Sequence, residues 1–327
     1  MADYLHLRLR GLGMFDFTSF APLAGLLGLG IVGLTLSTSR YARTTTGRAL
    51  LSSRSRLIDI EDRLGYRPTG KGPYDFLTQL PRNEIFQVEV SEKEVCLPRL
   101  PRSWDGLSLL HLTDLHFSGA ITRAYFDHVM DLSEQLGPDL IVFTGDLLDD
   151  QRLTEWLPST LGRLQAPLGR YFVLGNHDWY LQPELTRKAF RQIGWTDVAG
   201  ECVAFNHRDK SLAIGGSERP WMGGHPDFSS SPEGAFRLLL SHTPDNIPWA
   251  RSQCVDLMLA GHNHGGQIAF PFVGPVFAPS RYGCRYAGGT FWEDPTLLYV
   301  SRGLSGRQPL RWGCPPELTK LILRTPN

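Results

Sequence analysis

Five short polar motifs follow five apolar runs along this chain, and this pattern constrains the fold more than any other feature. The apolar runs cover residues 107–112, 139–143, 171–174, 236–240 and 255–260. The motifs after them are Asp114-Leu-His116, Gly145-Asp146-Leu-Leu-Asp149, Gly175-Asn176-His177-Asp178, Ser241-His242 and Gly261-His262-Asn-His264. Short, nearly continuous apolar runs are typical of strands buried on both faces. We therefore predict a sheet whose strand ends carry the polar side chains.

Three stretches between these runs are predicted to be helices. They cover residues 123–136, which follow Thr122, residues 153–164, and residues 183–193, which begin with a proline at a position that suits a first helical turn. Strands that alternate with helices indicate a layered α/β or α+β domain. A single layered sheet would satisfy this pattern. From residue 267 onward the chain is rich in Gly, Pro and aromatic residues, and we expect loops and short strands there.

The composition excludes some classes of protein. The chain has 327 residues and 33 Lys plus Arg against 33 Asp plus Glu, so its net charge is zero. A nucleic-acid-binding protein usually carries a basic excess, and we expect no nucleic-acid partner. The five cysteines are widely spaced and form no CxxC pair, which argues against both a disulfide framework and a thiolate zinc site and mildly favours a reducing compartment.

Residues 20–36 form an uncharged apolar run near the N-terminus. As a helix this run would reach about 25 Å, slightly less than the ~30 Å hydrocarbon core of a bilayer. It could span the membrane, lie at its surface, act as a signal-like anchor or pack on the domain. Arginines 40, 43, 48, 54 and 56 follow it with no acid among them, which predicts a membrane-associated protein whose main domain is cytoplasmic, with the extracytoplasmic side as the alternative.

These features predict three parts of the chain. Residues 1–40 are expected to be a membrane-associating segment, and residues 41–80 a polar linker with one short helix near residues 57–64. Residues 81–327 are expected to form the main folded domain, where residues 86–90 alternate as a half-buried strand does.

The polar motifs are predicted to meet in a metal site. In open α/β sheets, ligands bind at the carboxyl ends of the strands, which is where each motif lies. The alternation in Asp114-x-His116 and His262-x-His264 places both side chains of each pair on one side of extended backbone. A single histidine would more often be a core or surface residue, but five motifs in order are hard to explain as turns. Nitrogen and oxygen donors without a thiolate suit Mn, Fe, Zn or Mg.

The motif order resembles that of the calcineurin-like metallophosphoesterase family, DxH…GDxxD…GNHD…H…GHxH, over residues 107–264. The segments Gly265-Gly266-Gln267, Pro279-Ser-Arg-Tyr-Gly283 and Val300-Ser-Arg-Gly-Leu304 are similar to those of a membrane-associated bacterial branch. That branch includes phosphodiesterases and UDP-2,3-diacylglucosamine hydrolases. Asn263 stands where the branch usually has threonine, between two ligands, so we expect no loss of metal.

The resemblance implies a β-sandwich flanked by helices and a centre of two divalent metal ions. Carried over by motif, one ion would be held by Asp114, His116, Asp146 and His264. The other would be held by Asp146, Asn176, His242 and His262, with Asp146 as the bridge. Two ions at such a centre can activate a water and hold the phosphate oxygens.

Other residues are predicted to act beside the metals. We assign His177 to stabilise the developing charge or protonate the leaving group, and Asp178 to orient His177. Asp149 has two equal interpretations, a turn residue or a support for the site. Arg281 and Arg302 are candidate substrate ligands, because arginine binds phosphate bidentately; Arg307 is a third, with plain surface solvation as its alternative.

The sequence therefore predicts a hydrolase of phosphodiester or pyrophosphate bonds whose substrate is lipid-linked or nucleotide-linked, UDP-2,3-diacylglucosamine being one example. A phosphomonoesterase acting on a soluble substrate is the alternative, since its ligands would be the same. A non-catalytic scaffold on the same fold should lack ligands, and this set is complete. A nuclease would need a basic patch or a patch with interleaved aromatic residues, and the sequence supports neither.

Overall fold

The strands of the chain form two large packed sheets. The computed structural model describes residues 49–326. Its strands are β1 Leu50–Asp59, β2 Gln87–Cys96, β3 Ser108–Leu112, β4 Leu140–Thr144, β5 Arg170–Val173, β6 Thr196–Asp197, β7 Cys202–His207, β8 Lys210–Ser217, β9 Phe236–Ser241, β10 Leu257–Ala260, β11 Ala269–Phe270, β12 Gly274–Pro275, β13 Gly289–Glu293, β14 Thr296–Val300 and β15 Glu317–Arg324. Its α-helices are α2 Ile60–Leu64, α3 Arg123–Leu136, α4 Asn176–Tyr180, α5 Pro183–Gln192 and α6 Ile247–Ser252.

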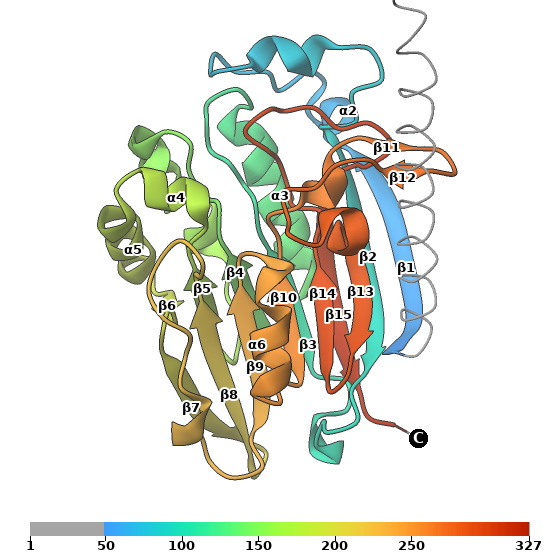
Figure 1. Cartoon of the computed structure of the whole chain (residues 1–327). Coiled ribbons are helices and arrows are strands. Elements are labelled where there is room, and N and C mark those ends of the chain that lie inside the picture. Colours follow the sequence, from blue (N-terminus) through green and yellow to red (C-terminus); the bar gives the residue numbers. More distant parts are fainter. Residues whose placement is uncertain (1–48, 327) are drawn as a thin grey trace, which may run out of the picture.

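The seven-stranded sheet has the order β1-β2-β15-β3-β4-β5-β6, and the six-stranded sheet the order β13-β14-β10-β9-β8-β7. Strands β11 and β12 form a separate small sheet. Helices α3 and α5 cover the outer face of the larger sheet, and α6 covers the smaller one (Figure 1). This is the β-sandwich flanked by helices that the family resemblance implied, and the fold prediction is confirmed.

The apolar runs are nearly continuous because both faces of the central strands are buried. On β4, Leu140 and Val142 pack between the two sheets, while Ile141 and Phe143 pack under the helices. Strand β10 alternates in the same way between the inter-sheet core and the core under α6. A side-chain period of two therefore buries apolar residues in two different layers.

Parallel pairing brings the ends of the key strands together. Strands β3, β4 and β5 are parallel to one another in the larger sheet. Strands β8, β9, β10 and β14 are parallel in the smaller sheet. The carboxyl ends of both sets lie at the same end of the sandwich, which is the upper end in Figure 1. Polar motifs from both sheets thus reach one place.

Two of the three predicted helices are present. Helix α3 has the predicted bounds and ends at Gly137, whose φ of 51° is left-handed, and α5 ends one residue earlier than predicted. The predicted helix over residues 153–164 is wrong. Two short 3₁₀ helices, Gln151–Trp156 and Leu161–Arg163, replace it. Pro158 lies between them. It has no backbone N–H to donate and its ring clashes with the preceding turn, so one continuous helix cannot form.

The predicted linker needs a correction within the described part of the chain. Strand β1 pairs antiparallel with β2 from residue 50 to residue 59, so these residues belong to the larger sheet. The strand was missed because it is an edge strand whose side chains are mostly exposed and include several serines and arginines, with no apolar alternation. The predicted short helix is present as α2, capped by Asp59.

The predicted membrane-associating segment, residues 1–40, lies outside the described residues. Among residues 49–326 no helix is both long and apolar enough to cross a bilayer. Membrane association therefore stays a prediction.

Candidate metal centre

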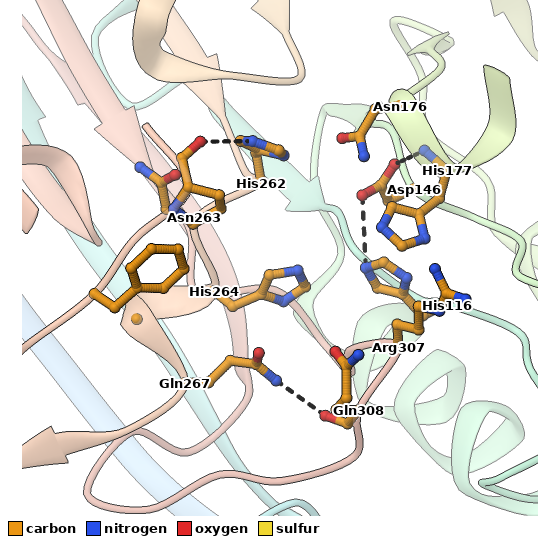
Figure 2. Close-up of a pocket in the computed structure, with 13 residues that line it drawn as sticks. His116, Asp146, Asn176, His177, His262, Asn263, His264, Gln267, Arg307 and Gln308 are labelled. Carbon is orange, nitrogen blue, oxygen red and sulfur yellow. Dashed lines mark hydrogen bonds and ion pairs between the residues drawn. The ribbon is translucent and has the colours of Figure 1, made fainter. Parts of the chain in front are cut away.

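The predicted metal ligands come together at the upper end of the sandwich. Asp114 and His116 follow β3, Asp146 follows β4, Asn176 opens α4 after β5, His242 follows β9, and His262 and His264 follow β10. Three groups of residues have potential ligating atoms within 4.8 Å of one another. One is His116 with Asp149 and His177, and the other two consist of predicted metal ligands. These two are Asp114 with His116, Asp146 and His264, and Asp146 with His242 and His262. Asp146 belongs to both groups of predicted ligands, and Figure 2 shows it with Asn176 beside the cavity. The Oδ1 of Asn176 lies 3.1 Å from the Nε2 of His242.

The backbone at these residues is strained. Positive φ angles occur at Asp114 (55°), His116 (46°), Asp146 (57°), His262 (68°) and His264 (50°). For a non-glycine residue such a conformation costs on the order of 1–3 kcal/mol, and it clusters at functional sites. The rest of the fold must therefore offset this strain, which directs the five side chains toward one centre.

Glycines in the motifs allow the strand-end loops to approach each other. A Cβ on Gly175 would collide with the carboxylate of Asp146, and one on Gly261 would collide with that of Asp114. Each glycine directly precedes a predicted ligand, Asn176 or His262. The glycines are required here by close approach rather than by turn geometry alone.

Each histidine of the centre is held by an oxygen on the side away from the cluster. The contacts are His116 Nδ1 to Asp149 Oδ2 (3.1 Å), His242 Nδ1 to the Thr144 carbonyl (2.8 Å), His262 Nε2 to the Pro279 carbonyl (2.9 Å) and His264 Nδ1 to the Ser305 carbonyl (3.2 Å). An imidazole that donates one N–H in this way presents the lone pair of its other nitrogen to a metal.

The inward nitrogens are available for cations. The Nε2 of His116 is buried and has no hydrogen-bond partner, a rare and costly state for a polar atom. A divalent ion would satisfy it. The orphaned nitrogen, the oriented imidazoles and the carboxylates together fit the donor set of two divalent ions.

The electrostatics of the centre also favour cations. Burial alone would raise the pKa of Asp146, but the imidazoles of His242 and His116 outweigh it and hold that pKa well below its usual value. Burial opposes the charged form of His242, yet the Asp146 and Asp114 carboxylates raise the pKa of this imidazole to about 9. Carboxylates that stabilise a protonated imidazole this strongly will also attract a metal ion, which displaces the imidazole proton on binding.

Asp149, rather than Asp178, is the carboxylate that orients His177. Its Oδ1 lies 2.5 Å from the Nδ1 of His177, and its other oxygen contacts His116. The carboxylate of Asp178 is buried and accepts backbone N–H groups of Gly175, Leu147 and Leu148. The predicted role of Asp178 is therefore wrong. This residue ties the loop after β5 to the loop after β4 and acts on the backbone.

Replacing Asp149 by asparagine should weaken the centre. The amide can accept from one imidazole while its NH₂ opposes the other, so His116 loses its fixed orientation. We expect metal affinity and turnover to fall about 10–100-fold, as is usual for the partners of metal-ligating histidines. Metal titration and steady-state kinetics measure both.

Asp150→Asn is the matched control for Asp149→Asn. Asp150 is the next residue, and its side chain pairs with the exposed Arg152 rather than with the site. Unchanged metal affinity in Asp149→Asn would mean that its contact with His116 has no role in binding.

A cavity of about 250 Å³ opens beside the ligands. Besides ligands and His177 it is lined by Asn263, Gly266, Gln267, Phe277, Pro279, Arg307 and Gln308. This volume is about eight times that of a water in the liquid. It admits a phosphate group with neighbouring atoms, and a larger substrate would extend along the rim. Gln267 donates from Nε2 to the carbonyl of Gln308 (2.9 Å) and closes the lower wall in Figure 2.

The arginine in the cavity wall is Arg307, which the sequence left open between phosphate binding and solvation. The predicted substrate ligand Arg302 instead forms ion pairs with Glu89 (3.1 Å) and Glu317 (3.4 Å). Its guanidinium is thus engaged away from the cavity, and that prediction is corrected. Arg281 is exposed and is not among the residues that line the cavity.

Two buried residues that the sequence did not single out support the site. The guanidinium of Arg311 is fully buried and donates to the carbonyls of His264 (2.9 Å) and Arg302 (2.8 Å). Glu218, which follows β8, accepts the N–H of Leu174 at 2.6 Å and pairs with Arg187. Both hold loops that carry ligands. Neither belongs to a recognisable motif, so only the tertiary structure reveals them.

Known proteins are similar to this chain in sequence. Residues 107–266 match the family described as calcineurin-like phosphoesterase. The chain is 32% identical over 273 residues to the metallophosphoesterase YkuE of Bacillus subtilis, covering 79% of this chain and 92% of that protein. It is 30% identical to the phosphodiesterase YaeI of Escherichia coli (66% and 81%) and 26% identical to the UDP-2,3-diacylglucosamine pyrophosphatase LpxG of Chlamydia muridarum (67% and 85%).

A centre of carboxylates and imidazoles at the strand ends of a helix-flanked sandwich defines a metal-dependent phosphoric ester hydrolase with a dinuclear divalent metal centre. The chain belongs to the calcineurin-like metallophosphoesterase family.

Proposed function

We propose that this enzyme hydrolyses phosphodiester or pyrophosphate bonds, on a lipid-linked or nucleotide-linked substrate at a membrane. The observation that carries the catalytic part is Asp146, whose carboxylate is shared by both ligand groups. We assign one ion to Asp114, His116, Asp146 and His264. The other is assigned to Asp146, Asn176, His242 and His262. When bound, the ions activate a water and neutralise charge on the phosphate oxygens.

His177 is the proposed acid of the reaction. It lines the cavity, and its backbone N–H donates to Asp146 Oδ1 at 2.9 Å, which fixes its place beside the ligands. Asp149 holds its Nδ1 and stabilises the protonated ring. A proton at Nε2 can then pass to the leaving oxygen, a step worth typically 10²–10⁴-fold. Arg307 can bind a second phosphate or the charge of the ester.

The proposed substrate class rests on the relatives and on the cavity wall. YaeI is named a phosphodiesterase and LpxG a UDP-2,3-diacylglucosamine pyrophosphatase, which acts on a lipid-bearing nucleotide by its name. In this chain the wall joins Arg307 to the apolar Phe277 and Pro279. Such a wall suits an ester with both a charged and an apolar part. The uncharged residues 20–36 support a location at the membrane, with the domain in the cytoplasm.

A hydrolysis panel tests the proposal. The full chain is loaded separately with Mn, Fe, Zn or Mg and assayed on bis-p-nitrophenyl phosphate, p-nitrophenyl phosphate and UDP-2,3-diacylglucosamine. We expect kcat/KM for the diester or the pyrophosphate to exceed that for the monoester by at least about tenfold. The chelator-treated protein is the control. A preference for the monoester would establish the phosphomonoesterase instead.

A further inference from the structure

The hairpin formed by β11 and β12 exposes large apolar side chains. Phe272 is 97% exposed, Phe277 69%, Val276 43% and Phe270 41%. Single exposed apolar residues are normal on protein surfaces, but four within eight consecutive residues form a patch. A clustered apolar patch on a soluble domain marks a contact surface.

Contacts at both ends of the hairpin fix its base to the domain, so the tip has a defined position on the surface. The N–H of Ala269 donates to the Trp312 carbonyl at 2.8 Å, and the ring of Phe270 packs edge-on against Trp312 with centroids 5.0 Å apart. On the other side Ser280 donates to Asp245 at 2.5 Å. The hairpin lies outside both large sheets, at the upper right in Figure 1. Phe272 at its tip belongs to none of the three hydrophobic cores of the described residues.

The apolar surface of the hairpin continues into the metal site. Phe277 is exposed and also lines the cavity, together with Pro279. Gln267, which precedes β11, lines the same wall. A surface that bound the tip would therefore lie next to the mouth of the catalytic cavity.

Arginines outnumber acids in the chain segments that flank the hairpin, and the Asp245 carboxylate contacts Ser280 and the N–H of Arg281 at its base. Residues 257–292 contain two arginines and no acid, and residues 295–316 contain three arginines and no acid. Arg281 and Arg307 are exposed, the first just beyond the hairpin and the second in the cavity wall. Aromatic side chains flanked by arginines are typical of segments that enter the headgroup region of a bilayer with anionic lipids.

We propose that the β11–β12 hairpin is a membrane-contact element that inserts Phe272 and its apolar neighbours into an anionic bilayer surface and sets the cavity against that surface. The occupant is the bilayer itself, and the substrates are phosphate esters of membrane lipids that enter along Phe277. The substrate part of this proposal rests on the proposed function, whereas the docking part does not. Insertion of one phenylalanine contributes to the free energy of membrane binding because it removes apolar area from water.

Partition onto vesicles tests the docking. The full chain, Phe272→Asp and Leu185→Asp are mixed with vesicles of phosphatidylcholine and phosphatidylglycerol. Leu185 is the matched control, since it is 50% exposed but lies on α5. We expect Phe272→Asp to lower the partition coefficient at least about tenfold. Leu185→Asp should change it by less than about twofold, as surface substitutions do. Both variants should hydrolyse soluble bis-p-nitrophenyl phosphate like the parent.

A second measurement applies if residues 1–48 keep every variant on the vesicles. Phe272→Trp and Leu185→Trp are compared with the parent in vesicles whose acyl chains carry bromine, which quenches tryptophan by contact. Quenching of the added fluorescence is expected at position 272 and not at 185. Parent-like partition of Phe272→Asp together with an unquenched Phe272→Trp would overturn the proposal.

The remaining outcomes separate the alternatives. A Phe272→Asp variant that changes oligomeric state in sedimentation, with vesicle partition intact, would assign the hairpin to a second copy of the chain and overturn the membrane role. Absence of diester and pyrophosphate hydrolysis in the metal-loaded parent would defeat the proposed function alone. The vesicle result would still decide whether the hairpin contacts lipid.

Discussion

Replacing Asp146 by asparagine should remove the bound metals and lower kcat/KM by about a thousandfold or more. The Oδ2 of Asp146 lies 3.1 Å from His242 Nε2 and 3.6 Å from His116 Nε2, so this carboxylate stands between the two ligand groups. A neutral amide cannot supply the negative charge that two cations share. The ions provide several kcal/mol of transition-state stabilisation, and each 1.36 kcal/mol is tenfold in rate.

Elemental analysis of the dialysed variant and its steady-state kinetics measure this result. The amide has nearly the same volume as the carboxylate and fits the buried position, and thermal unfolding should confirm that the fold is intact. Asp150→Asn again serves as the control, because it changes a carboxylate that pairs with exposed Arg152. Normal metal content with normal activity in Asp146→Asn would show that Asp146 is not the bridging ligand.

The apolar runs predicted most of the central strands because burial leaves a direct trace in the sequence, whereas the second sheet was implied only by the family resemblance. Strands such as β4 are buried on both faces, so each appears as an apolar run with a polar residue at its end. Strand β1 left no such trace, since it lies at the edge of the larger sheet and exposes most of its side chains. A polar, arginine-rich segment reads as a linker until its partner strand is known.

The clustering of the predicted ligands was predictable because each of them lies in a short motif at a strand end. The supporting contacts were less so. Spacing cannot decide which carboxylate, Asp149 or Asp178, reaches His177, because that depends on how two loops from different strands meet. The sequence named Arg302 as a candidate phosphate ligand and left Arg307 open between phosphate binding and solvation. Only the ion pairs of Arg302 with Glu89 and Glu317 distinguish them.

Replacing His177 by alanine should leave the metals in place and lower kcat by about 10²–10⁴-fold. His177 contacts Asp149 through its ring and Asp146 only through its backbone, which alanine retains. The loss should depend on the leaving group. A p-nitrophenolate is stable enough to leave without a proton, whereas an alkoxide must be protonated as it leaves. We therefore expect a larger loss for an alkyl phosphodiester than for bis-p-nitrophenyl phosphate. Metal content and the two kcat values measure the effect.

The comparison with Asp149→Asn separates the two roles of His177. If His177 donates a proton, Asp149→Asn should repeat the dependence on the leaving group, because it removes the carboxylate that stabilises the protonated ring. If the ring only stabilises charge on the phosphate, kcat should fall by the same factor for both substrates. A His177→Ala protein that also loses its metals would contradict both roles. It would show instead that the His177 ring is a metal ligand, like Asp146 and Asn176.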